Sequence, residues 1–466
     1  MIMWKGFLKW LKRLLGGALL LSVVAYLALL AVNWRDRPPS EDAMRLAALY
    51  QNRPTVSAED NGYVYAMGFA TARNGDPHAA GLRRVEWLRE IPDDAQSPLN
   101  ADPAPDDQSY KSARSPAAQS IAEACRSPTH QCIAALGAAD EAIRDWLQSE
   151  EWLLDRYMTL LRHEGWLETA IFDERAPLPS YAMVLDAQKL LLAKASILAS
   201  RKDAAGVRSL LTSDVRFWRR VLDSSDILIT KMIAVAALKR TYGVGNLALR
   251  RLPPELAMDG MPQEWTAPMT DAERSLMRCL VGEWLYADRL MKHMEASGSW
   301  QSTVGYENDA GVANRLLRRM TKPLFQPQDL SNRRAEMFIK LVHALNAPFD
   351  QFPAALARAE EITQPSDEFI LPSVYNPIGD ILLWIGSPAF APYGARVTDL
   401  EGIRRAAVLT TELRSRRVPA ERVPGELKAS GVRGYTSAPF GWDAEEGAIV
   451  FTGLEPNERG RHVFKY

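Results

Sequence analysis

The sequence LLGGALLLSVVAYLALLAVNW, from Leu14 to Trp34, contains no charged residue and decides the setting in which the rest of the chain folds. A helix needs about 20 apolar residues to cross roughly 30 Å of hydrocarbon, and it satisfies its own backbone polar groups. The 13 residues before this stretch hold four basic side chains and no acidic one. Such a one-sided basic flank favours a cytoplasmic N-terminus. We therefore expect a single-pass protein of a bacterial inner membrane, with a cytoplasmic segment 1–13, a transmembrane helix 14–34 and a periplasmic body.

A cleaved signal peptide is the alternative interpretation of this N-terminus, because it also combines a basic start with an apolar core. The apolar core is longer than a signal peptide needs. Neither Leu29-Leu30-Ala31 nor Ala31-Val32-Asn33 provides the small-x-small pattern of a cleavage site. The sequence therefore favours an uncleaved signal anchor.

The composition indicates a globular body of ordinary charge. Of the 466 residues, 47% are hydrophobic and 24% charged, so the chain is long enough to bury a full core. The 56 basic and 57 acidic residues give a net charge of −1, and four of the basic residues belong to the anchor. A nucleic-acid partner would need a basic footprint, so we expect no nucleic-acid binding.

Cys125 and Cys132 are candidates for a disulfide if the body lies in an oxidising compartment. In one continuous helix their α-carbons would be about 10 Å apart, which is too far for a disulfide. Ser127-Pro128 favours a loop between them, and closing it would stabilise the fold by about 2.5 kcal/mol on the chain-entropy model. Two free thiols are the alternative. His130 adds one more zinc ligand to the pair, which is too few for a structural site, and we expect no metal and no cofactor.

The organisation predicted after the anchor is mainly α-helical, with stacked antiparallel helices and a small C-terminal β-hairpin. The predicted segments are a tether with short helices (35–92), a Pro/Asp/Ser-rich loop (93–120), a main helical domain (121–296), a loop-rich segment (297–330), a second helical segment (331–429) and the β-hairpin tail (430–466).

Three helices with short connections form the predicted centre of the main domain, at Tyr181–Ser200, Asp203–Leu222 and Ser225–Arg240. Short connections force neighbouring helices to run antiparallel. The stretch from Ile143 to Leu161 keeps one apolar face, which predicts a single helix of about five turns. These central helices resemble a tetratricopeptide-type stack, although they lack the Trp, Leu-Gly and Tyr pattern of that repeat.

Two further helix starts are predicted from capping boxes, at Thr270-Asp271-Ala272-Glu273 and at Thr398-Asp399-Leu400-Glu401. The first should open a helix to about Glu295 and the second a helix to about Arg417. Ile449–Thr452 and Arg461–Tyr466 are β-prone runs that predict the hairpin, with Phe440 and Trp442 packed under it.

Gly243-Val244-Gly245-Asn246 begins a stretch that matches the spacing of a dinucleotide-binding loop. That loop requires a preceding strand, and a helix precedes these residues instead. The better interpretation is the C-terminal cap of the preceding helix.

No motif in the sequence identifies a catalytic chemistry, and we assign no catalytic residue. A peptidoglycan-cutting enzyme would need a carboxylic acid kept protonated in an apolar cleft. The candidates for this alternative are Glu283, His293 and Glu307. His163, with Glu164 and Glu168, could also be imagined as a base with an orienting acid, although a solvated helix end explains these residues equally well.

In its anchor, cysteine pair and hairpin tail the chain resembles uncharacterised single-pass envelope proteins of Gram-negative bacteria. The resemblance implies an architecture and no activity. Because stacked helices offer concave surfaces, we expect protein binding or scaffolding with another envelope protein, including immunity-type inhibition of a periplasmic toxin. The alternative is an envelope hydrolase acting on peptidoglycan or another envelope substrate.

Overall fold

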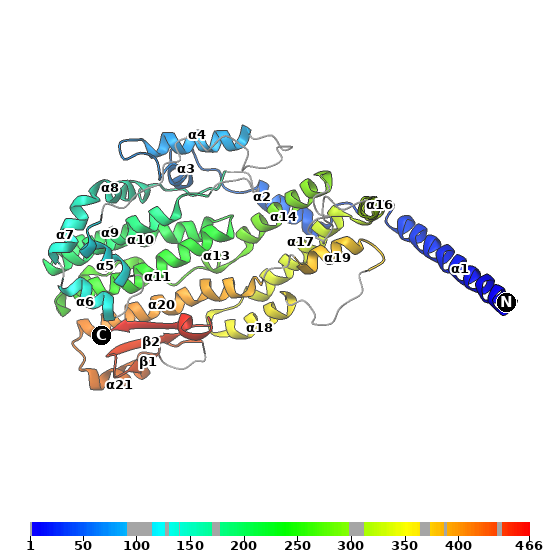
Figure 1. Ribbon diagram of the computed structural model, residues 1–466. Helices are drawn as coiled ribbons and strands as arrows, with labels where there is room; N and C mark the ends of the chain where they lie inside the picture. The colour runs from blue at the N-terminus through cyan, green and yellow to red at the C-terminus, as the bar shows by residue number, and fades with distance from the viewer. Residues whose placement is uncertain are drawn as a thin grey trace. The chain divides into compact units, whose positions relative to one another are not determined.

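The computed structural model describes residues 2–90, 114–125, 130–138, 140–169, 178–297, 312–363, 373–385, 389–435 and 440–466, and helices dominate them (Figure 1). The chain forms two compact units, each built from segments that are far apart in the sequence. The first comprises Met1–Ala48, Trp284–Ile339 and Thr363–Pro388, and the second Leu49–Glu283, Lys340–Ile362 and Ala389–Tyr466. The mainly helical class is confirmed, whereas the predicted segments 121–296 and 331–429 each contribute to both units.

The first unit contains the apolar N-terminal helix. Its elements are α1 (Ile2–Val32), most of α2 (Glu41–Gln51), the C-terminal part of α14 (Met277–Ser297), α16 (Val312–Thr321), the 3-10 helix η4 (Lys322–Leu324), most of α17 (Pro327–Leu345) and α19 (Pro377–Ile385). Over Trp10–Val32, α1 is long and apolar enough to cross a membrane. The helix ends at Val32, so Trp34 follows it and does not belong to it.

Asn33, directly after α1, is the centre of a buried polar junction. Its side-chain nitrogen donates to the carbonyl oxygens of Leu29 (2.9 Å) and Val374 (2.8 Å). Its side-chain oxygen accepts from the backbone N–H of Asn376 (2.7 Å), and its carbonyl oxygen accepts from the side-chain nitrogen of Gln326 (2.8 Å). The end of α1 is thereby joined to segments about 300 residues away in the sequence.

The predicted tether after Asn33 is held against α17. Both carboxylate oxygens of Asp36 accept backbone N–H groups in the first turn of α17, from Gln328 (2.8 Å) and Asp329 (3.0 Å). An acidic side chain at a helix N-terminus satisfies free donors and complements the helix dipole. Arg37 then pairs with the Asp329 carboxylate at 2.9 Å. We call Asn33, Asp36, Gln326, Asp329 and Asn376 the anchor junction.

The second unit holds most of the helices and the sheet. Its helices are α3 (Gly62–Met67), α4 (Pro77–Glu90), α5 (Pro116–Ala124), α6 (His130–Ala138), α7 (Asp140–Ser149), α8 (Glu151–Leu160), α9 (Tyr181–Ser200), α10 (Ala204–Ser224), α11 (Leu228–Arg250), α12 (Ala257–Gly260), α13 (Asp271–Arg274), the N-terminal part of α14, most of α18 (Phe352–Thr363), α20 (Ala391–Ser415) and α21 (Val423–Ala429). Single 3-10 turns are η2 (Pro254–Leu256), η3 (Gln263–Trp265), η5 (Phe349–Gln351), η6 (Ala420–Arg422) and η7 (Asn457–Gly460).

The centre of this unit is a layer in which α9, α10 and α11 contact one another and α20 packs against α11 (Figure 1). The bounds of α9 agree with the prediction. The predicted helix end near Gly243 is wrong, because α11 continues through Gly243 and Gly245 to Arg250. A Cβ at Gly245 would lie 3.1 Å from Leu211 and 3.3 Å from Trp265, so this glycine permits close packing in mid-helix.

The predicted helix from Ile143 to Leu161 is interrupted at Glu150, which separates α7 from α8. The Glu150 side chain is fully buried, accepts a hydrogen bond from Trp146 Nε1 at 2.5 Å and pairs with Arg114 at 3.2 Å. The Glu150 side chain therefore points into the protein at a position where the sequence predicted a continuous amphipathic helix.

The capping box at Thr270 is confirmed, but the helix that it opens is only α13. The chain becomes extended at Ser275, and α14 begins separately at Met277. The buried Lys231 side chain donates to the Glu273 carbonyl oxygen at 3.1 Å. This carbonyl would accept from the N–H of Met277 in a continuous helix, so a tertiary contact takes its place at the break.

The helix start predicted at Thr398 is wrong, since α20 begins at Ala391 and these residues lie in its interior. Asp399 accepts from the Tyr435 hydroxyl at 2.7 Å and from the Leu454 N–H at 3.0 Å. Glu401 pairs with Arg404 one turn along α20 at 2.7 Å and also accepts from the backbone N–H of Met269 at 3.0 Å. Distant partners therefore use the acidic side chains that the sequence pattern assigned to a cap.

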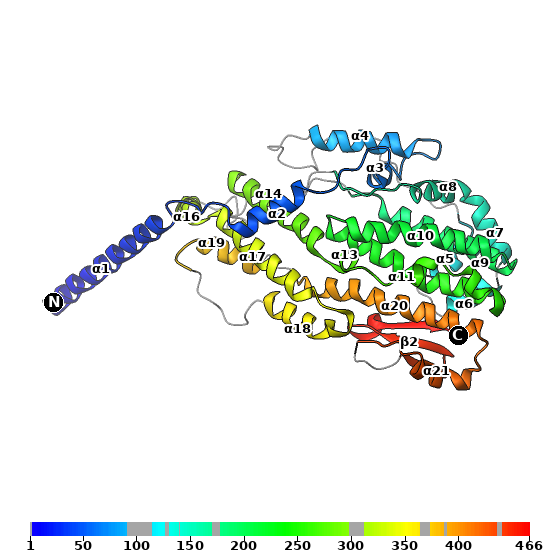
Figure 2. The same cartoon turned by 180° about the vertical axis from the view of Figure 1, so that it is seen from behind.

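The C-terminal sheet has three antiparallel strands in the order β1 (Gly441–Asp443), β2 (Ala448–Thr452) and β3 (Arg461–Lys465). The predicted hairpin is the β2–β3 pair, and β1 is an additional strand. Phe440 is buried with its ring 5.6 Å from that of Phe451, as expected, whereas Trp442 belongs to β1. Both β2 and β3 contact α20, as the reverse view in Figure 2 also shows.

Candidate functional site

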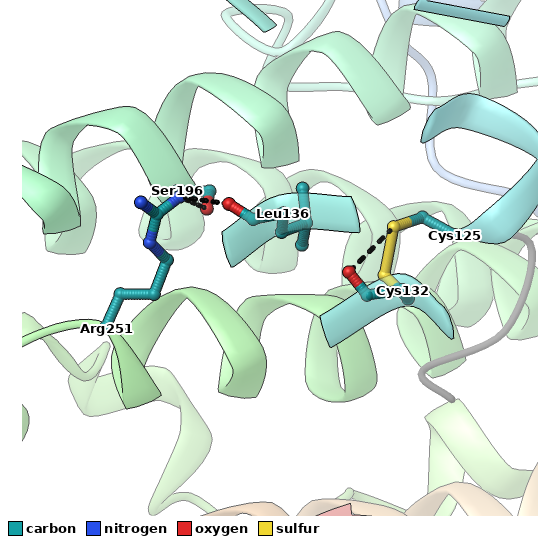
Figure 3. Close-up of a disulfide and its surroundings, with 5 residues drawn as sticks. All are labelled: Cys125, Cys132, Leu136, Ser196 and Arg251. Atoms are coloured by element: carbon teal, nitrogen blue, oxygen red, sulfur yellow. Dashed lines mark hydrogen bonds between the residues drawn. A yellow bond between two sulfur atoms is a disulfide. The ribbon is translucent and has the colours of Figure 1, made fainter. Parts of the chain in front are cut away.

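Cys125 and Cys132 lie at disulfide distance at the start of the candidate site (Figure 3). Their α-carbons are 4.5 Å apart, because α5 ends at Ala124 and α6 begins at His130. This agrees with the prediction that one continuous helix does not contain both residues. The covalent link holds the start of α6 next to the end of α5.

Arg251 fixes the other end of α6. One guanidinium nitrogen, Nη1, donates to the Leu136 carbonyl oxygen at 2.5 Å and to Ser196 Oγ at 2.9 Å (Figure 3). The other, Nη2, pairs with Asp140 at 2.8 Å. The disulfide and this arginine together determine where the last turn of α6 lies in the second unit.

A pocket of about 340 Å³ opens beside this turn. It is lined by three arginines and four other residues, namely Arg250, Arg251, Arg414, Leu136, Gly137, Leu247 and Tyr466. They come from the C-terminal end of α11, the C-terminal turns of α6 and α20, and the residue after β3. Arg250 Nε donates to the main-chain oxygen of Tyr466 at 3.0 Å, and Arg414 Nη2 donates to the Arg250 carbonyl oxygen at 2.7 Å.

The positive charge of this pocket is only partly neutralised. Within the described residues, Arg251 pairs with Asp140, but neither Arg250 nor Arg414 has a side-chain carboxylate partner. Arg414 Nη1 is buried and has no hydrogen-bond partner in the described part of the chain. Burial, assisted by the charge of Arg250, lowers the pKa of Arg414 to about 10. A buried donor without a partner costs about 1–3 kcal/mol, and more when it is charged.

The pocket has the chemistry of an oxyanion site. A guanidinium presents parallel N–H donors that match a carboxylate or phosphate group, and such charge-assisted bonds are about twice as strong as neutral ones. Leu136 and Leu247 add apolar wall beside the arginines. A Cβ at Gly137 would meet no heavy atom within 4 Å, so this side of the pocket is open. The volume suits one or two side chains of a partner better than a large cofactor.

Among the described residues, the candidates for the hydrolase alternative do not come together in one site. Glu283 and His293 are half-buried in α14, and Glu283 belongs to the second unit whereas His293 belongs to the first. Glu307 lies outside the described residues. No group of three His, Cys, Asp or Glu side chains that could hold a metal ion occurs in the described ranges.

His163 and Glu168 have separate structural partners. His163 Nδ1 lies 3.2 Å from the carbonyl oxygens of Thr159 and Leu160, so this nitrogen carries the proton in the neutral ring. Burial lowers the pKa of His163. Glu168 accepts from the backbone N–H of Ile227 at 2.9 Å, just before α11, and burial raises its pKa to about 7.

Asp214 is the centre of a fully buried network that a search for catalytic acids would also select. Its carboxylate accepts from the hydroxyls of Tyr157 and Thr241, both at 2.5 Å, and from Gln188 Nε2 at 3.0 Å. Trp218 Nε1 donates to the Tyr157 hydroxyl at 2.7 Å. Burial raises the pKa of Asp214. Because both carboxylate oxygens already have partners, the network holds α8, α9, α10 and α11 together.

The arginine pocket was missed from the sequence because the end of α11 was placed too early. Arg250 and Arg251 then fell outside any helix, although a basic pair followed by Pro253 is a common signal for a helix C-terminus. The contribution of Arg414 and Tyr466 has no local signal, because α20 and β3 meet α11 only in the tertiary structure.

Comparison of the chain with protein-family models, with curated proteins and with solved structures found no match.

Proposed function

We propose that this protein is a membrane-anchored binding protein of the cell envelope and that its second unit recognises an acidic segment of a partner protein. The observation that carries the proposal is the arginine pocket, in which Arg250 and Arg414 lack a side-chain carboxylate among the described residues. A carboxylate of the partner that enters the pocket would pair with the guanidinium groups of Arg250 and Arg414, which line it.

Two observations support placement of the protein in the cell envelope. The basic residues before α1 favour a cytoplasmic N-terminus, with the body on the opposite side of an inner membrane. The Cys125–Cys132 pair suits an oxidising compartment, and it holds the α6 turn that lines the pocket. The partner is accordingly a periplasmic or membrane protein, and toxin inhibition is one form that such binding takes.

Site-directed photo-crosslinking in cells tests the proposal. A benzophenone amino acid at Gly137 would face the pocket without displacing a neighbour, because this position is open. The same amino acid at Gly425 in α21 is the matched control, since that glycine is equally open and does not line the pocket. We expect a crosslinked partner from position 137, with the attachment point in an Asp- or Glu-rich peptide identified by mass spectrometry.

Substitution of the arginines tests whether the crosslink depends on the pocket. The double substitution Arg250→Gln and Arg414→Gln should abolish the crosslink at position 137. Arg216→Gln removes a charge from an exposed ion pair on α10 and should leave the crosslink intact. A crosslink that survives the double substitution, or the absence of a crosslink at position 137, would reject the pocket as a protein-binding site. The hydrolase alternative predicts a different result, namely loss of function on Glu283→Gln with unchanged folding.

A further inference from the structure

The helix α16 lies beside the C-terminal end of α1, as both ribbon views show (Figures 1 and 2). The Tyr26 hydroxyl donates to the main-chain oxygen of Met320 at 3.0 Å. Tyr26 precedes the end of α1 by six residues, which corresponds to about 9 Å along the helix axis. The C-terminal turn of α16 therefore meets α1 within the apolar span and not beyond it.

The contact is part of a packed core in the first unit. Leu29 and Leu30 of α1 pack against a cluster of buried side chains formed by Leu324, Phe325, Leu330, Ile378 and Leu382. The anchor junction adds hydrogen bonds at the same end of α1. Because α1 is fixed to this core, insertion of α1 into a bilayer also brings α16 to the membrane surface.

Large apolar side chains remain exposed on α16. Leu316 and Leu317 are 59% and 43% exposed. In water this exposure carries an unfavourable hydration free energy, whereas a bilayer interface would bury the side chains.

Basic side chains accompany the apolar ones. Arg319 in α16 and Lys322 in η4 are exposed, and no carboxylate pairs with either of them within the described ranges. Basic and apolar residues on one helix are typical of segments that lie in the plane of an interface, buried to about 5–10 Å. The depth of the Tyr26–Met320 contact falls within that range.

We infer that α16 forms a second membrane contact, which lies in the headgroup region of an anionic leaflet around the exit of α1. This contact is independent of the arginine pocket, which belongs to the other unit. It would restrain the first unit against the bilayer, whereas α1 alone would leave it free to tilt.

Spin labelling of the full chain in liposomes tests this contact. Leu316→Cys places a nitroxide in it, and Ile229→Cys on α11 is the matched control, since that isoleucine is 49% exposed and lies in the second unit. The native thiol of Cys279 is buried, and Cys125 and Cys132 are paired, so labelling should be confined to the new cysteine. We expect the Leu316 label to be accessible to oxygen and protected severalfold from an aqueous nickel complex, with the reverse for Ile229.

A second experiment varies the lipid composition and the basic residues. Adding phosphatidylglycerol to phosphatidylcholine should increase the protection of the Leu316 label. Arg319→Gln with Lys322→Gln should remove that increase, while the control pair Arg201→Gln with Arg208→Gln, exposed in the second unit, should preserve it. Equal nickel accessibility at positions 316 and 229 would overturn the inference. Spin–spin broadening that disappears on dilution with unlabelled protein would also overturn it, because a second copy of the chain would then cover the surface.

Discussion

The anchor junction and the arginine pocket are both clusters of polar side chains, but they differ in how completely their groups are paired. In the junction, Asn33 uses its side-chain donor, side-chain acceptor and carbonyl oxygen, and Asp329 is paired with Arg37. In the pocket, Arg414 Nη1 has no partner among the described residues. A network whose groups are all satisfied fixes segments in place, whereas a network with a free charged donor gains free energy when a ligand supplies an acceptor.

The Asp214 network extends this comparison, because it is fully paired but lies in the same unit as the pocket. Full pairing, and not membership of one unit, should therefore determine which substitutions destabilise the fold. Substitutions in the two paired networks should lower the free energy of unfolding, whereas a substitution in the arginine pocket should hardly change it.

The largest effect is expected for Asp214→Ala. The substitution leaves the Tyr157 hydroxyl without its buried acceptor and leaves Gln188 and Thr241 with the Ala237 carbonyl oxygen as a remaining acceptor, which should lower the free energy of unfolding by about 3 kcal/mol. Urea denaturation of the full chain in detergent, followed by tryptophan fluorescence, would measure it. Asp145→Ala, on the exposed surface of α7, should change this free energy by less than about 0.5 kcal/mol. Equal effects of the two substitutions would contradict a structural role for the network.

A smaller loss is expected for Asn33→Leu in the anchor junction. The leucine cannot pair with Val374 or Asn376, and we expect a local loss of about 2 kcal/mol. This corresponds to roughly 30-fold faster amide hydrogen exchange in residues 373–385 if these residues exchange through local opening. Asn52→Leu, at an exposed position, is the control. Unchanged exchange in residues 373–385 would mean that the junction does not hold this segment.

The smallest effect on the unliganded protein is expected for Arg414→Gln. The substitution removes a buried donor that lacks a partner, but it also removes the bond from Arg414 Nη2 to the Arg250 carbonyl oxygen. Because these two effects oppose each other, the free energy of unfolding should change by no more than about 0.5 kcal/mol. Inorganic phosphate should stabilise the wild type more than this variant, by about 1.4 kcal/mol at ten times its dissociation constant. Denaturation in phosphate and in chloride at equal ionic strength measures the difference. The same phosphate response in both proteins would show that the pocket holds no oxyanion.

Local sequence signals predicted the elements that depend on local interactions. The bounds of α9, the capping box at Thr270 and the β2–β3 hairpin follow from apolar periodicity, capping side chains and β-prone runs, and the structure contains them. The prediction that Cys125 and Cys132 are not in one helix also followed from local geometry. The placement of the body in the periplasm remains a prediction.

The errors occurred where distant partners use a side chain that has an obvious local role. Asp399 and Glu401 looked like parts of a helix cap, yet the Tyr435 hydroxyl and the Met269 N–H donate to them inside α20. Gly245 looked like part of a helix end, yet it makes room for Trp265 within α11. A local pattern cannot show which distant group will approach it, and in these cases the approach determined the structure.

The first 34 residues by themselves determine an apolar helix long enough for a bilayer, because hydrophobicity and length are properties of a contiguous segment. Only the tertiary structure decided what surrounds the end of that helix and where arginines meet. Asn33 contacts residues beyond position 320, and the pocket combines α6, α11, α20 and Tyr466. Such clusters form because packing brings together segments that no spacing in the sequence relates.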